Sequence, residues 1–313
     1  MNCLDVKRLL PVLLATLLVL VGASAVRAQA HLAFDSARDA VTALIAALEE
    51  NNVEMLGKLL GPGSEDVFTS GDEVADASGR ASFLALFAEK HELVPAGDYT
   101  MVLQVGAEDW PLPTPFTEVD GKWYLDGAAG ADEIVYRRVG RNELGAIAVC
   151  RGFIDAEVEY AAQGHDGNEP GVFATRLRSD PGLQNGLYWP VEEGEPQSPI
   201  GEAVARAAAE GYRAVAGERM PYHGYYYRML YAQGANAEGG AIEYFQDGAL
   251  TGGVALIAWP ASYEVSGVMS FMINQDGLVY EKDLGEDTAT VVEGIEEFDP
   301  DDSWSLVDSG DDA

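Results

Sequence analysis

Apolar residues recur every three or four positions in several parts of the first ninety residues, which predicts helices there. We expect a first helix from residue 36 to about residue 50 and a shorter one over 53–60, ended by a Gly-Pro-Gly stretch. The stripe of the first helix consists of Val41, Leu44, Ile45 and Leu48. Residues 70–79 are polar and predict a loop, followed by a helix that ends near His91.

The hydrophobic period then changes from helical to strand-like. Residues 99–105 are rich in strand-forming side chains and predict one strand. Residues 116–119 and 122–125 flank Asp120-Gly121, a strong signal for a β-hairpin. The three prolines between residues 111 and 115 disfavour a central strand there. Helices followed by such a hairpin resemble the small cone-shaped domains of the nuclear-transport-factor-2-like (NTF2-like) and cystatin-like classes.

The middle of the chain returns to helical spacing. Residues 132–138 favour a helix that Gly140 interrupts, and Asn142 is a plausible cap for a second helix reaching about residue 163. One apolar stripe of that helix contains Ile147, Cys150, Ile154, Val158 and Ala161. Residues 164–199 predict a long structured loop, because their hydrophobic islands need burial, and an Ala-rich helix should follow over 200–210.

The last third of the chain holds dense aromatic and β-branched residues, typical of an antiparallel sheet. Strands are expected at 225–231, 253–259, 267–273 and 278–282, with a hairpin between the last two. The acidic tail after residue 298 should fray or be disordered. The alternative is that Trp304 packs back against the folded part of the chain. A helix packed on such a sheet is similar to the globular heads of type IV pilins and pseudopilins. The predicted fold class is therefore α+β.

The length of 313 residues indicates two domains, which we place at 31–140 and 141–298, with an acidic tail at 299–313.

Residues 1–30 are typical of a secretory signal peptide. A positive start precedes a short apolar run, and small residues form A-x-A-like cleavage sites ending at Ala28 or Ala30. We therefore expect an exported protein, periplasmic or extracellular, with no membrane span after cleavage. Cleavage would leave Cys150 as the only cysteine, so an internal disulfide is excluded.

Composition and charge narrow the partners. The chain is 48% hydrophobic and 23% charged, as in ordinary globular proteins, but its formal net charge is −33. Such a charge disfavours nucleic acid and anionic lipid surfaces, since both are polyanions. The ordinary explanation for the acidity is solubility.

Five stretches, in order along the chain, resemble the DUF2950 family of exported bacterial proteins. They are SGDEVAD (70–76), RRVGRNELGAI (137–147), GLYWP (186–190), PYHGYYYRML (221–230) and ALIAWPASYEVSGVMSFMINQDGLVYEKDLG (255–285). The resemblance covers residues 34 to 304. It implies export in bacteria, and it supplies no catalytic residue, because the family's function is unknown.

The candidate binding residues fall into two groups. Arg137, Arg138 and Arg141 form a basic cluster suited to an anion or a partner, although pairing with acidic neighbours is the simpler explanation. His223 lies just before the first predicted strand of the C-terminal sheet, and Tyr226 and Arg228 lie on that strand, in an aromatic stretch. An apolar setting can lower the pKa of an imidazole into a range useful for function, which makes His223 a candidate. Histidines in such settings are more often structural.

A weak calcium pattern is formed by Asp166, Asn168 and Glu169, but it departs from the twelve-residue calcium loop, and an ordinary solvated turn is the simpler explanation. No catalytic set and no cofactor motif is evident, so we expect no cofactor and favour a non-catalytic role.

Two functional hypotheses follow. The first is an envelope protein that acts through protein–protein contacts. The second is a small-molecule binder or enzyme that uses a concave pocket of the N-terminal domain, with His91, Asp109 and Trp110 as polar candidates. The ligand itself is unknown. A deep apolar pocket with converging polar groups would favour the second hypothesis, and an exposed aromatic stripe would favour the first.

Overall fold

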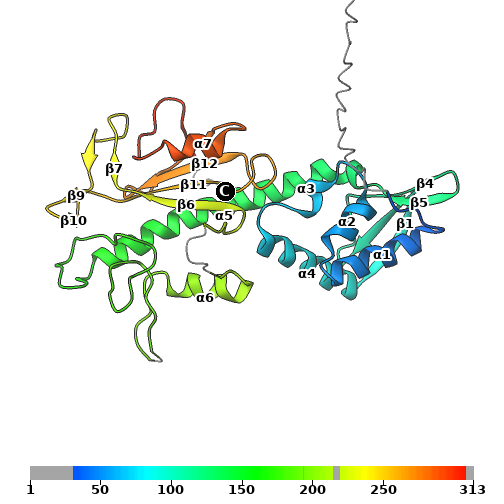
Figure 1. Ribbon diagram of the computed structural model, residues 1–313, viewed down its shortest axis with the longest axis horizontal. Coiled ribbons are helices and arrows are strands. Elements are labelled where there is room, and N and C mark those ends of the chain that lie inside the picture. Colours follow the sequence, from blue (N-terminus) through cyan, green and yellow to red (C-terminus); the bar gives the residue numbers. More distant parts are fainter. Residues whose placement is uncertain (1–30, 193, 214–218, 308–313) are drawn as a thin grey trace, which may run out of the picture.

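A computed structural model describes residues 31–192, 194–213 and 219–307 of the chain. The predicted signal peptide, residues 1–30, lies outside the described residues. Two hydrophobic cores are present, one built from residues 37–125 and the other from residues 146–298. We call the parts around them the N-terminal and C-terminal lobes. One long helix, α5 (Gly127–Ala161), runs from one lobe into the other (Figure 1).

Four helices precede the sheet of the N-terminal lobe. They are α1 (Ala37–Glu49), α2 (Val53–Leu60), α3 (Glu65–Phe68) and α4 (Glu73–Glu89). The first two confirm the predicted helices, and Ser36 and Asn52 cap them by accepting hydrogen bonds from backbone N–H groups of the first turn. The predicted loop at 70–79 was wrong beyond residue 72. Asp72 caps α4 by accepting from the N–H of Ala75, so the polar stretch starts a helix.

The N-terminal sheet has the strand order β1-β2-β4-β5, with β3 also paired to β2, and all pairs are antiparallel. Its strands are β1 (His91–Gly97), β2 (Thr100–Val105), β3 (Trp110–Pro111), β4 (Phe116–Val119) and β5 (Lys122–Leu125). The predicted hairpin is confirmed, and Asp120 and Gly121 both have positive φ, at 51° and 74°. Strand β1 was not predicted, since a proline interrupts its pattern.

Helix α5 is continuous over 35 residues, so the predicted interruption at Gly140 and the cap at Asn142 were wrong. A glycine inside a helix costs only about 1 kcal/mol, and both ends of α5 are packed into cores that outweigh this. Asn142 is instead buried, and its side-chain amide donates to the carbonyl oxygen of Ser266, 2.9 Å away. The domain boundary predicted at residue 140 lies inside this helix.

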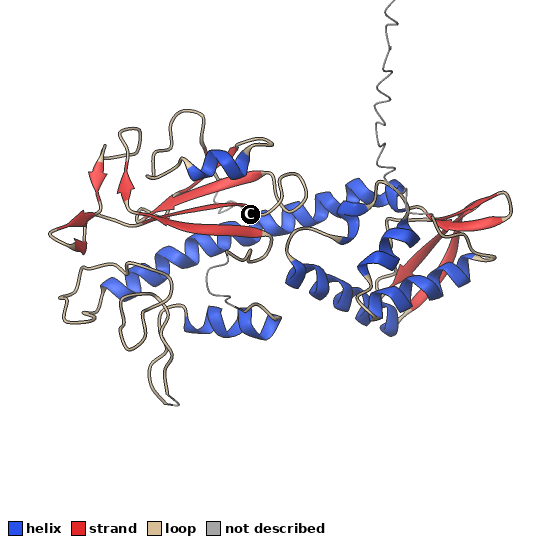
Figure 2. Cartoon of the chain, viewed as in Figure 1, coloured by secondary structure: helices blue, strands red, loops and turns tan. Residues whose placement is uncertain are grey.

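The C-terminal sheet has the antiparallel order β14-β13-β12-β11-β6. Its strands are β6 (Tyr225–Leu230), β11 (Ala255–Pro260), β12 (Met269–Asn274), β13 (Val279–Asp283) and β14 (Ser305–Leu306). Helix α5 contacts strands β11, β12 and β13, and α7 (Thr288–Glu293) lies over β11 (Figure 2). Every residue of β11 is buried, because a helix covers each side of the sheet.

Short hairpins and one long connection complete this lobe. The hairpins pair β7 (Ala232–Gln233) with β8 (Ile242–Glu243) and β9 (Phe245–Gln246) with β10 (Ala249–Leu250). The described part of 164–199 forms no helix or strand, yet it buries Ala174 and Leu187, as the structured-loop prediction required. Helix α6 (Gly201–Glu210) follows, close to the predicted span.

The frayed tail was wrong for residues 299–307. Strand β14 pairs with β13, and Trp304 packs against the core with the ammonium of Lys282 5.7 Å from its ring centre. The α+β class is confirmed. Within the described ranges, no helix combines the length and the apolar character that a bilayer crossing requires.

Candidate functional site

A pocket of about 640 Å³ opens beside the first half of α5, and both lobes contribute to its lining. Helices α1, α2 and α4 supply one side, and residues 110–114 and α5 supply another. Glu210, Tyr212 and His223 reach it from the C-terminal lobe. A volume of this size lies within the usual range of small-molecule pockets.

Most of the lining is apolar, because the pocket opens directly onto the N-terminal core. The apolar residues are Leu44, Leu48, Leu56, Leu60, Val67, Phe68, Val74, Phe83, Leu86, Trp110, Leu112, Pro113 and Ile134. Most of those on helices belong to residues that pack on the N-terminal core, and Trp110, Leu112 and Pro113 come from β3 and the segment that follows it. A ligand with an apolar body would be removed from water at this surface.

The pocket has more positive than negative side chains, although the chain as a whole is strongly negative. Four arginines line it, Arg80, Arg137, Arg138 and Arg141, against two carboxylates, Asp76 and Glu210. The whole chain carries a formal charge of −33. Arg137, Arg138 and Arg141 lie three, four and seven residues after Ile134. One face of α5 therefore carries all four residues into the pocket.

Two of the arginines are fixed by backbone carbonyl groups at the end of α3. Arg138 donates to the carbonyl oxygens of Asp66 and Val67, at 2.6 and 2.7 Å, and Arg80 donates to that of Phe68 at 3.2 Å. Carbonyl groups satisfy the N–H donors without neutralising the charge. Burial lowers the pKa of Arg138, and the neighbouring Arg141 lowers it further, against the opposing effects of nearby carboxylates.

Arg137 and Arg141 are both exposed. Arg137 is paired with Glu133 at 2.6 Å, and its guanidinium lies 5.4 Å from the ring centre of Trp110. Arg141 forms no salt bridge with any residue that the structure describes. Its charge is therefore available to an anion that enters the pocket. The simpler explanation from the sequence, pairing with acidic neighbours, holds for Arg137 and not for Arg141.

The C-terminal lobe reaches the pocket through a network around Asp72. One carboxylate oxygen of Asp72 accepts from the hydroxyl of Tyr212 and from the N–H of Gly224, both at 2.9 Å. The N–H of His223 donates to the same hydroxyl at 3.1 Å. Since Asp72 is 1% exposed, these bonds tie the two lobes together in a site with little access to water.

His223 occupies the rim of the pocket, with its Nε2 atom 3.2 Å from a carboxylate oxygen of Glu210. Its φ of 51°, followed by 79° at Gly224, is that of a two-residue hairpin turn, and Tyr222 and Tyr225 exchange backbone hydrogen bonds across it. The turn directs the imidazole toward the C-terminal end of α6. Of the six predicted binding residues, His223 and the three arginines of α5 meet in one pocket.

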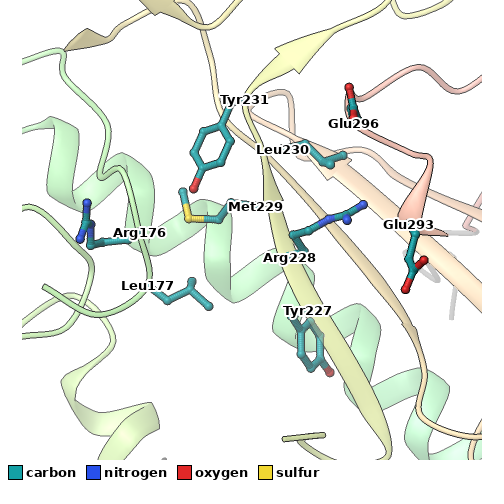
Figure 3. Close-up of a pocket in the computed structure, with 9 residues that line it drawn as sticks. All are labelled: Arg176, Leu177, Tyr227, Arg228, Met229, Leu230, Tyr231, Glu293 and Glu296. Carbon is teal, nitrogen blue, oxygen red and sulfur yellow. The ribbon is translucent and has the colours of Figure 1, made fainter. Parts of the chain in front are cut away.

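Tyr226 and Arg228 lie elsewhere. Arg228 lines a second pocket of about 470 Å³ beside β6 (Figure 3), and its guanidinium donates to the carbonyl oxygens of Val292 and Ile295. Tyr226 is half-buried against Trp259, with ring centres 5.7 Å apart. Tyr225 is fully buried, so this stretch presents no exposed aromatic stripe along the strand.

Other candidates have structural partners. The carboxylate of Asp166 accepts from the N–H of Gln184 at 2.8 Å, and no group of three His, Cys, Asp or Glu side chains in the described ranges is placed to hold a metal ion. His91 stacks on Phe87 and Asp109 pairs with Lys90, and neither lines the first pocket. Of the three polar candidates proposed for an N-terminal pocket, only Trp110 contributes to it.

Sequence reasoning missed Asp72, Tyr212 and Arg80. A signal existed for Asp72, because it lies in the stretch 70–76, one of the five on which the family resemblance was based. Its partner Gly224 lies in another of the five, 221–230. Tyr212 follows the end of α6 and has no comparable sequence signal.

The family of the chain is shown by comparison with family models. A model described as a protein of unknown function (DUF2950) matches residues 31–307. The chain belongs to the DUF2950 family. No curated protein and no solved structure matches it. The likeness to pilin heads and to NTF2-like domains therefore stays a prediction.

Proposed function

We propose that this DUF2950 protein binds a small organic anion with an apolar body in the pocket beside α5. The observation that carries the proposal is the combination of an apolar lining with four arginines, in a chain whose net charge is −33. The rest of this acidic molecule repels an anion, and the positive charge of the pocket counteracts that repulsion locally. Such a concentration is more easily explained by a ligand than by solubility.

The arrangement suits an amphiphilic carboxylate. The apolar chain of such a ligand would lie against the leucines of α1 and α2, and its head group would meet Arg138 and Arg141. Arg138 is held by two carbonyl oxygens, so little side-chain freedom is lost when an anion arrives. Arg141 supplies the charge that has no carboxylate partner among the described residues.

The geometry favours a small-molecule binder over a protein that acts only through an exposed aromatic stripe. Apolar and polar groups converge on one pocket, whereas the aromatic residues of β6 are buried or half-buried. Export remains part of the proposal, supported by the character of residues 1–30 alone. A periplasmic or extracellular binding protein is the role that unites the two observations.

Calorimetric titration of the chain from residue 31 onward tests the proposal with three probes. Decanoate has both the tail and the anionic head, acetate lacks the tail, and decyltrimethylammonium reverses the head charge. We expect binding of decanoate and none of the other two. Loss of a hydrogen bond to a charged group costs about 1.5–3 kcal/mol, so Arg141→Gln should weaken decanoate binding about tenfold or more.

The control is Arg151→Gln, which changes another exposed arginine on the same helix, outside the pocket. It should leave the affinity for decanoate unchanged. Equal losses in both variants would mean that general charge, not the pocket, governs binding. Failure of decanoate to bind the unaltered protein would overturn this ligand class.

A further inference from the structure

The edge of the C-terminal sheet carries a second feature that is independent of the first pocket. Strand β6 is the last in the order β14-β13-β12-β11-β6, so it has a sheet neighbour on one side only. The second pocket, of about 470 Å³, lies along it and is lined by the five consecutive residues 227–231 (Figure 3). Leu177 and Arg176 lie on one side of this groove, and Glu293 and Glu296 lie on the other.

The direction of the backbone groups of β6 follows from its neighbours. Tyr225 exchanges both of its backbone hydrogen bonds with Tyr222, and it stands opposite Pro260, which has no N–H to offer. The groups of Tyr225 therefore point away from β11. Hydrogen-bonding direction alternates along an antiparallel strand, so those of residues 227, 229 and 231 point away too.

Two residues of this outer edge have backbone groups without a partner in the described ranges. The carbonyl oxygen of Tyr231 accepts from the N–H of Tyr244, which closes one end, and the turn at Tyr222 closes the other. Between them, the N–H and C=O groups of Tyr227 and Met229 make no hydrogen bond with a described residue outside the sheet. These four groups face the groove. An edge of this kind is a template for another strand.

We propose that the groove binds an extended segment of a partner protein, which adds a strand to β6 through the backbone groups of Tyr227 and Met229. In such strand addition, main-chain hydrogen bonds supply affinity and alternate side chains supply specificity. The closed ends limit the added strand to a few residues.

Charge indicates a basic segment as the occupant. Of the two cations at the groove, Arg176 is paired with Asp180 at 2.6 Å, which leaves the single charge of Arg228 against two carboxylates and the groove with an excess of negative charge. Glu293 and Glu296 are exposed and form no salt bridge within the described ranges. A second copy of the chain would bring another net charge of −33 to the same place and be repelled.

The probe is a blocked hexapeptide of alternating valine and lysine, titrated against the chain from residue 31 onward and followed by amide exchange in NMR spectra. We expect saturable binding that protects the amides of Tyr227 and Met229 and weakens with salt. The same peptide methylated at its valine nitrogens cannot donate those hydrogen bonds, so it should bind at least tenfold more weakly. A peptide with glutamate in place of lysine should bind more weakly as well.

A double variant tests the charge on the protein side. Glu293→Gln with Glu296→Gln should weaken the lysine peptide about three- to tenfold, and Glu238→Gln with Glu243→Gln, exposed elsewhere in the lobe, should not. Equal affinity for the methylated peptide, or protection confined to other amides, would overturn strand addition. Protection of the same two amides by self-association, seen in sedimentation, would overturn the proposed partner.

Discussion

Glu157 should make the stability of this protein depend on pH in a way that a single substitution removes. The residue lies on α5 and is fully buried. One of its carboxylate oxygens accepts from the N–H of Ala174 at 2.9 Å, and the other has no hydrogen-bond partner in the described ranges. Burial raises the pKa of Glu157 from 4.5 to about 8, although the bond from Ala174 opposes the shift. The side chain is therefore neutral at pH 7 in the folded protein.

The sign and size of the effect follow from linkage. Between pH 4.5 and 8 the folded state holds a proton on Glu157 that the unfolded chain has lost. The contribution of Glu157 to the free energy of unfolding is therefore fully present below pH 4.5. It falls as the pH rises through the window, by about 1.4 kcal/mol for each pH unit. Over the whole window the loss is about 5 kcal/mol, a large fraction of the typical free energy of unfolding. Above pH 8 no further loss comes from this group.

The variant Glu157→Gln keeps the shape and an acceptor for Ala174 but cannot ionise. We expect urea unfolding at pH 5 to give nearly equal free energies for the variant and the parent. At pH 8 the variant should be more stable by about 3–4 kcal/mol. Glu159→Gln, an exposed carboxylate on the same helix, serves as the control and should show no such trend. A difference between Glu157→Gln and the parent that stays constant with pH would refute the reasoning.

Three further outcomes are expected. Asp72→Ala removes the cap of α4 and leaves the hydroxyl of Tyr212 and the N–H of Gly224 without their acceptor, so it should cost about 3–5 kcal/mol in urea unfolding. A cost below 1 kcal/mol would show that the lobes are held together elsewhere. Burial raises the pKa of Cys150 to about 12, so a thiol reagent at pH 8 should modify the chain from residue 31 onward only after unfolding. Gly224→Ala should destabilise by at least about 2 kcal/mol, because a Cβ there would lie 2.4 Å from a side-chain nitrogen of α5. Gly167→Ala shares the positive φ in open space and should cost only about 1 kcal/mol, and equal costs would exclude the clash.

Several elements could be predicted because their signals are local. Helix α1 has its apolar stripe and its cap within about fifteen residues, and the Asp120-Gly121 hairpin needs only two residues with positive φ. The α+β class followed from the change in hydrophobic period near residue 99. Where a local rule failed, packing outweighed it: Gly140 lies inside a helix that two cores hold, and the acidic tail pairs with β13.

The candidate site shows the same division between local and long-range signals. The basic cluster of α5 and His223 were recognisable from sequence as unusual residues, and both were proposed as binding residues. That they share one pocket was not predictable, since it depends on how the lobes are placed along α5. The second group of candidates separated for a related reason, because strand alternation and the edge position of β6 direct Arg228 to a different groove.

The sequence by itself determined the family, the acidic character, the fold class, most of the helices and most of the longer strands, since these depend on composition and on neighbours within a few turns. Only the tertiary structure decided the site. Asp72 meets Gly224 across 152 residues of chain, and the arginines of α4 and α5 line the same pocket as leucines of α1 and α2. Contacts at such separations arise when cores pack and buried polar groups find partners, and no local pattern in the chain encodes them.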